Sequence, residues 1–182
     1  MKNTSKKLIL IMALAVALIC TAVGSTVAYL FDRTPPIENS FEPVYISCAV
    51  EEKFDGITKS EVKVRNTGDI NAYVRATYVV MWTADDGSVL GTMPKADVDY
   101  TVILGSPRWQ KGTDGFYYYS SQVAADSSTE VFLDSISVIG TAPSGYKLSV
   151  HVAATAIQAD PGGVVEESWG AVVQPNGTIV AP

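Results

Sequence analysis

The sequence INAYVRATYVVMW, residues 70–82, is the strongest β-strand signal in this chain, because it is long and rich in β-branched and aromatic side chains. Its side chains alternate between two faces with a period of two, which is the pattern of a β-strand. One face carries the following residues: Ala72, Val74, Ala76, Tyr78, Val80 and Trp82. The stretch therefore predicts a long strand that packs one face into a core.

Similar alternation occurs on both sides of this strand, at residues 44–52, 61–66 and 147–158. Shorter candidate strands occupy residues 100–104, 116–120, 129–133 and 135–139. Turn sequences such as NTGD and TADDGS separate them. Strands at this spacing predict an all-β fold, a β-sandwich or barrel, over residues 44–182. Residues 163–170 could form one helical turn, and the tail 172–182 either a last strand around an Asn-Gly turn or a frayed end.

The N-terminal 28 residues have the form of an export signal. Three lysines precede an uncharged apolar run, residues 8–23. We expect cleavage after Ala28, so that Tyr29 begins the mature chain, because Thr26 and Ala28 are small residues at the positions a signal peptidase requires. The alternative is a retained membrane anchor over residues 8–31, since about 20 apolar residues span a bilayer. Both readings leave the N-terminus in the cytoplasm and the body outside.

The remainder of the chain is acidic. All 19 acidic residues lie from Asp32 onward, which leaves 10 basic residues and a net charge of −9 over residues 29–182. Such a body repels phosphate backbones and anionic lipid, so we expect no nucleic-acid partner and contact with the membrane only through residues 8–31 before cleavage. With one cysteine beyond the apolar run, Cys48, no internal disulfide forms after cleavage. We expect Cys48 to pack as a small hydrophobic residue, with intermolecular pairing as the alternative.

The sequence shows no constellation of residues typical of an enzyme. His151 is the single histidine, and neither a zinc-protease nor a nucleophile motif is present. The acidic residues Asp85, Asp86, Asp97 and Asp99 favour turns over a cation site, which needs six or more oxygen ligands. We therefore expect no catalytic residue, no metal and no cofactor.

The aromatic stretch GFYYYSS, residues 115–121, offers a possible ligand surface. If one face of this strand is core, the other exposes two tyrosines, and Tyr117, Tyr119 and the nearby Trp109 could then bind a sugar or a partner. The alternative is that a neighbouring loop covers them.

Three segments also carry a resemblance to a known family. Residues 24–32, GSTVAYLFD, resemble the G-x-T-x-A-Y/F-x-x-D junction of signals processed by the SipW-type signal peptidase. Residues 64–76, VRNTGDINAYVRA, and residues 156–170 resemble stretches common in small exported proteins with such signals. The relatives best understood as a group are the TasA/camelysin proteins of the biofilm matrix.

The resemblance implies a jelly-roll-like antiparallel β-sandwich that is exported and then cleaved. It also implies that the freed N-terminal residues Tyr29, Leu30 and Phe31 add as a strand to the next subunit. Residues 29–43 would form the extended segment that carries this strand, since three prolines lie in residues 33–43. No catalytic residue of the family is matched.

Our leading hypothesis is a secreted or cell-surface structural protein, a matrix or fibre subunit that binds its own copies or other matrix proteins. The alternative is a membrane-anchored extracellular module that binds a glycan or cell-wall polymer through the aromatic stretch. A third hypothesis, a hydrolase, requires the aspartates named above to meet in one cleft.

Overall fold

A computed structural model of the chain describes residues 6–7, 12–14 and 44–182. Residues 6–7 and 12–14 are helical, and residues 44–182 belong to one compact unit, Pro43–Pro182. The predicted cleavage site at Ala28 and Tyr29 lies outside the described residues, as do the donor residues Leu30 and Phe31 and the extended segment 29–43.

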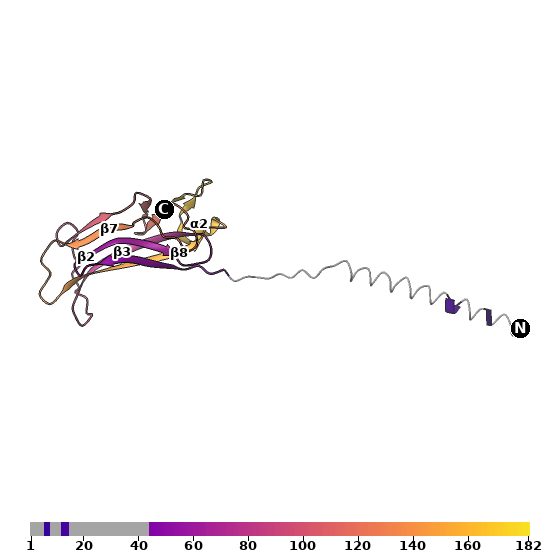
Figure 1. The fold of residues 1–182 in the computed structure, drawn as a ribbon, viewed down its shortest axis with the longest axis horizontal. Coiled ribbons are helices and arrows are strands. Elements are labelled where there is room, and N and C mark those ends of the chain that lie inside the picture. Colours follow the sequence, from indigo (N-terminus) through magenta and orange to yellow (C-terminus); the bar gives the residue numbers. More distant parts are fainter. Residues whose placement is uncertain (1–5, 8–11, 15–43) are drawn as a thin grey trace. The chain divides into compact units, whose positions relative to one another are not determined.

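The body is built mainly from two four-stranded antiparallel sheets (Figure 1). The first sheet has the strand order β1 (Cys48–Phe54), β2 (Thr58–Asn66), β7 (Leu133–Val138) and β4 (Tyr100–Leu104). The second has the order β5 (Trp109–Lys111), β6 (Tyr117–Tyr119), β3 (Ala72–Thr83) and β8 (Lys147–Gln158). The body, residues 44–182, is therefore mainly β with antiparallel sheets, as the alternating sequence pattern predicted.

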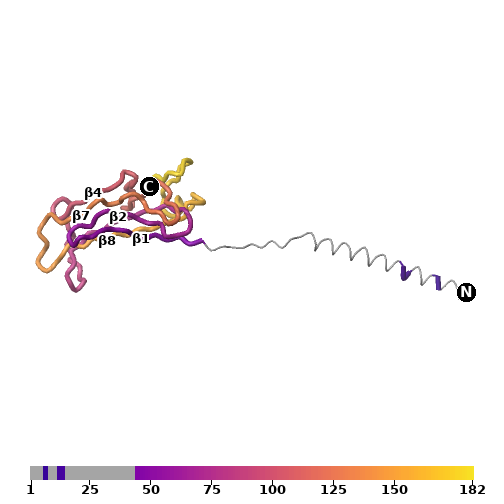
Figure 2. The backbone as a smooth tube through the Cα atoms, in the orientation of Figure 1, coloured from indigo at the N-terminus to yellow at the C-terminus, as the bar shows by residue number. Residues whose placement is uncertain are grey.

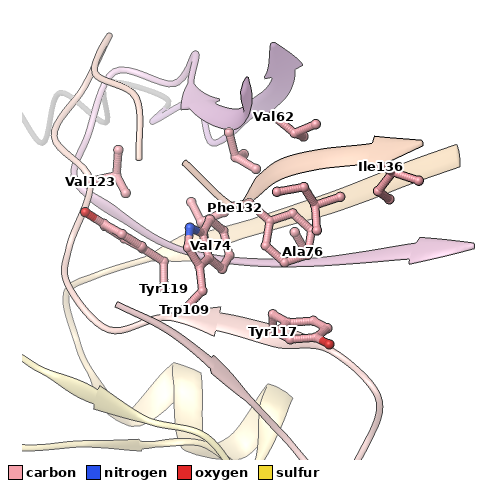
Figure 3. Packing of buried hydrophobic residues seen from close by; sticks show 11 residues of the cluster. Val62, Val74, Ala76, Trp109, Tyr117, Tyr119, Val123, Phe132 and Ile136 are labelled. Carbon is pink, nitrogen blue, oxygen red and sulfur yellow. The ribbon is translucent and has the colours of Figure 1, made fainter. Parts of the chain in front are cut away.

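The inner faces of the two sheets share one hydrophobic core. Val62 and Val64 of β2 and Leu133 and Ile136 of β7 pack with residues of the opposite sheet such as Val74. Phe132 lies at the centre of this core, with its ring centroid 4.8 Å from that of Trp109 and 5.2 Å from that of Tyr117 (Figure 3). This packing holds the two sheets face to face.

The chain crosses repeatedly between the sheets. Of the connections between β1 and β8, only β1–β2 and β5–β6 join neighbours in the same sheet. As a result β3 and β8, which are far apart in sequence, pair along their whole length, from Ala72 opposite Gln158 to Thr83 opposite Lys147. The strands β1 and β8 end their respective sheets and contact each other (Figure 2).

A second, smaller core covers the outer face of the β3–β6 sheet. The helix α2 (Gly163–Trp169) and the hairpin of β9 (Val172–Val173) and β10 (Ile179–Val180) lie over Tyr73 and Tyr118, both fully buried. The helix ends at Gly170, whose φ of 67° is the left-handed conformation that glycine adopts readily. The tail is thus a hairpin around the Asn-Gly turn, the first of the two predicted alternatives.

The NTGD turn between β2 and β3 is held by a buried amide side chain. Asn66 Nδ2 donates to the carbonyl oxygens of Ile70, at 2.7 Å, and Val123, at 3.0 Å. Its Oδ1 accepts from the backbone N–H of Gly68 at 3.0 Å. A Cβ at Gly68 would lie 2.5 Å from the carbonyl oxygen of Tyr45, so the close approach of the chain before β1 requires glycine here.

Most predicted strands are confirmed, and some boundaries were wrong. The strands predicted at 100–104 and 147–158 are β4 and β8, and residues 163–170 contain α2. Residues 129–132 are not a strand, because they contact β2 through isolated backbone hydrogen bonds such as that from Thr129 N to Val64 O. The strand predicted at 44–52 begins instead at Cys48 and extends to Phe54, and the short strand β5 was not predicted.

Candidate functional site

The possible aromatic ligand surface is not exposed, and the alternative that these side chains are covered is correct, although the opposite sheet covers them and not a loop. Trp109, Tyr117 and Tyr119 are each only 7% exposed and belong to the core between the sheets (Figure 3). The indole N–H of Trp109 donates to the carbonyl oxygen of Glu130 at 3.1 Å. The opposite face of the strand is also covered, because the ring centroid of Tyr118 lies 5.9 Å from that of Trp169 in α2. Both faces of β6 are therefore used for packing.

The aspartates considered for a hydrolase or cation site stabilise separate turns. Asp86 Oδ1 accepts from the backbone N–H of Ser88 at 2.9 Å, and Asp99 Oδ2 accepts from that of Lys95 at 2.8 Å. Asp85 forms an exposed ion pair with Lys147 at 3.0 Å. In the part of the chain that the structure describes, no three His, Cys, Asp or Glu side chains lie close enough to hold a metal ion.

The other two residues considered for chemistry also lie apart. His151 is exposed on β8. Cys48 is half-buried at the start of β1 beside the main core, and burial raises the pKa of its thiol above the ordinary value. A raised pKa lowers the fraction of the thiol that is present as the reactive thiolate. This agrees with the prediction that Cys48 packs as a small hydrophobic residue.

A groove lies where β1 and β8 meet, and we call it the β1–β8 groove. Its volume is about 560 Å³, and it is lined by the end of β1, the β1–β2 turn, β2, β7 and β8. The lining residues are Glu52, Phe54, Gly56, Ile57, Lys59, Ile136, Val138, Lys147, Leu148, Ser149, Val150 and His151. Two large apolar side chains at its border are exposed, Phe54 by 67% and Ile57 by 71%. The groove thus combines apolar walls with a few charged side chains.

An irregularity in the β1–β2 pairing places Lys59 in this groove, opposite Glu52. The register shifts between Glu51 and Lys53, and Glu61 opposite them has a φ of 49°, unusual for a residue other than glycine. Such a bulge changes the faces that the following side chains occupy. The extra residue lies on β2, so Lys59 faces the groove although regular alternation from Val62 would turn it outward. Glu52 lines the groove by the regular alternation of β1 after Cys48 and Val50. Lys59 belongs to a segment that the alternating pattern did not include.

Lys59 makes two polar contacts across the groove. Its Nζ lies 2.8 Å from Glu52 Oε1, and it donates to the backbone carbonyl oxygen of Val150, on the other sheet, at 2.9 Å. The side chain of Lys59 is 13% exposed and that of Glu52 33% exposed. Among the described side chains of β2, Lys59 is the one that donates a hydrogen bond to the backbone of β8.

Within the described residues, the edge of β8 beside this groove is unpaired, although β1 of the other sheet contacts β8 there. β8 ends its sheet and pairs only with β3. Residues of an antiparallel pair alternate in the direction of their backbone N–H and C=O groups. Because Val150 O bonds Lys59, the backbone of Val150 is directed away from β3. An extended peptide could pair with this edge and place alternate side chains in the groove.

Arg75 forms a second polar cluster on the outer face of the same sheet. Its guanidinium lies 4.2 Å from the ring centroid of Phe116 and 4.8 Å from that of Trp169. It also bonds Asp114 Oδ2 at 3.4 Å. Although burial acts to raise the pKa of Asp114, hydrogen bonds from Tyr118 and Phe116 together with the charge of Arg75 hold it below its ordinary value. These contacts are satisfied within the fold, so the cluster joins α2 to the sheet.

No family model, curated protein or solved structure matches this chain. Among the described residues, no helix is both long and apolar enough to cross a membrane.

Proposed function

We infer that the protein is a non-enzymatic structural subunit of an extracellular matrix or fibre, exported by its N-terminal signal and assembled by strand addition. In this proposal a SipW-type signal peptidase cuts after Ala28, and the freed residues Tyr29, Leu30 and Phe31 of one copy pair with an open sheet edge of the next. The body would be a jelly-roll-like sandwich, an assignment that the repeated crossing of the chain between its two sheets supports.

The observation that carries this proposal is the β1–β8 groove. An unpaired strand edge is a template for another strand, and proteins that keep such an edge usually protect it. Here the 12-residue strand β8 ends its sheet beside a groove with apolar walls, including Phe54, Ile57 and Leu148. Apolar donor residues such as Leu30 and Phe31 suit such walls.

Electron microscopy of the released protein tests the proposal. The N-terminus of the released form is first measured by intact mass, with Tyr29 as the expected first residue. Wild-type protein is then compared with a variant lacking residues 29–34 and with a variant of equal length in which Tyr29, Leu30 and Phe31 are serine. Fibres are expected from the wild type alone. Fibres from all three proteins, or from none, contradict assembly through this segment.

A further inference from the structure

One hydrogen bond occupies a backbone acceptor that strand addition would need. The carbonyl oxygen of Val150 is directed toward the open edge of β8, and it already accepts from Lys59 Nζ at 2.9 Å. In an antiparallel ladder, an incoming strand would donate a backbone N–H to this same oxygen. A carbonyl oxygen has two lone pairs, so a strand that adds along β8 past Val150 must displace the amine of Lys59 or share the oxygen with it, and either weakens the existing bond.

The position of Lys59 makes this competition significant. Its side chain is 13% exposed, and a hydrogen bond from a charged amine is stronger than one from a neutral amide. Lys59 belongs to β2, an inner strand of the other sheet, and its amine reaches the unpaired edge of β8. Charged side chains at a sheet edge are one of the means by which proteins prevent unwanted strand pairing. Removing the amine should thus leave Val150 O free and the edge easier to pair.

Glu52 provides an alternative partner for the displaced amine. Its Oε1 lies 2.8 Å from Lys59 Nζ, and a lysine ammonium has three donors, so the ion pair does not depend on the bond to Val150. The amine can leave the carbonyl oxygen without losing its charged partner. This contact therefore allows a reversible release.

We propose that Lys59 regulates strand addition at the β1–β8 groove by competing with the incoming strand for the carbonyl oxygen of Val150, with Glu52 holding the displaced amine. This inference rests on the proposed function, since it concerns the same groove. It assigns a specific role to a residue whose charge would otherwise be unexpected between two sheets.

The test measures the affinity of a labelled peptide with the sequence of residues 29–34, YLFDRT. The acceptor is the released chain that lacks these residues, so it cannot donate its own strand. Fluorescence anisotropy is compared for this protein and for its Lys59→Met and Lys59→Arg variants. We expect Lys59→Met to bind on the order of tenfold more tightly, because the peptide no longer displaces a charge-assisted bond. Lys59→Arg keeps a charged donor and should bind as the unchanged protein does.

Two further variants control for folding and for charge. Lys53→Met removes a lysine from the neighbouring strand, where its ion pair with Glu61 is exposed, and should leave the affinity unchanged. The double variant Lys59→Met/Glu52→Leu replaces the whole pair with apolar side chains, which avoids an unpaired carboxylate and should show the same gain. If Lys59→Met alone does not fold, the peptide affinity of the double variant tests the role of Lys59 in its place.

The possible outcomes separate the two proposals. Peptide binding with equal affinity in all variants overturns the role of Lys59 and leaves strand addition in place. A gain in Lys53→Met as large as that in Lys59→Met also overturns it, since the effect is then one of net charge. No binding by any variant contradicts the proposed function itself.

Discussion

The guanidinium of Arg75 lies 4.8 Å from the ring centroid of Trp169, and this contact joins the helix α2 to the outer face of the sheet. The same guanidinium also donates two hydrogen bonds of 3.2 Å, one to the hydroxyl of Thr155 on β8 and one to the hydroxyl of Tyr118 on β6. One side chain thus connects three strands and a helix. Its planar shape is needed because it stacks on rings and bonds in its plane at once.

The first prediction follows from this geometry. Arg75→Lys keeps the charge but loses the planar stacking on Phe116 and Trp169, so we expect the free energy of unfolding to fall by about 1–2 kcal/mol. Urea denaturation measures the change. Arg65→Lys is the matched control, because the ion pairs of Arg65 are long and exposed, and it should change the free energy by less than about 0.5 kcal/mol. An equal loss in both variants would argue against a specific role of the stacking.

The second prediction concerns the aromatic core. Tyr117→Ala removes a ring that packs against Phe132 and Tyr78, and we expect a loss of about 3–5 kcal/mol in the free energy of unfolding. Thermal denaturation of the purified variant measures it. The control Tyr45→Ala truncates a residue that is 63% exposed and should be nearly neutral. A stable Tyr117→Ala variant would show that the ring is not part of the core.

The third prediction concerns the turn after β2. Asn66→Ala leaves the buried carbonyl oxygen of Val123 without its side-chain donor, and it removes the bond to Gly68, so unfolding should become easier by about 2 kcal/mol or more. Chemical denaturation provides the measurement. Asn71→Ala is the control, since Asn71 is exposed and makes only a 3.4 Å contact with Gln122. Similar values for the two variants would contradict the structural role of Asn66.

The fourth prediction concerns alkaline pH. Burial, followed by the neighbouring Tyr117, raises the pKa of Tyr78 from 10.0 to about 12. Since the folded state favours the neutral phenol, the contribution of Tyr78 to stability is complete below pH 10 and is lost as the pH rises toward 12. Burial also raises the pKa of Tyr100 and that of Tyr118, so more than one tyrosine should ionise late in a spectroscopic titration. Tyr78→Phe should reduce the amplitude of the latest ionisation by one tyrosine. If Tyr78→Phe leaves the titration curve unchanged, the assignment is wrong.

The strands that sequence could predict are those with long, regular alternation. β3 and β8 keep their period over 12 residues each, so their faces and much of the main core follow from the pattern. The three-residue strand β5 is too short to show a period, and residues 129–132 contact β2 without forming a strand. The local sequence pattern does not predict whether such short segments form strands, because their structure depends on tertiary contacts.

The site was harder to predict than the strands. The alternation around Tyr117 correctly separates two faces, but the second face is covered by α2, which lies more than 40 residues further along the chain. Lys59 enters the groove only because of the bulge at Glu61. Glutamate is not a residue that indicates a bulge, so the sequence does not predict this irregularity. The groove therefore depends on a local irregularity that periodicity does not contain.

The pairing of β3 with β8 has a consequence for the order of folding. Arg75 and Thr155, which face each other on these strands, are 80 residues apart in sequence. Closing such a large loop costs chain entropy before any contact compensates, so non-local strand pairing is slow. During synthesis, β3 emerges long before its partner, and the second sheet can be completed only when nearly the whole chain has appeared. Under the export that we propose, this order favours folding after transport rather than during it.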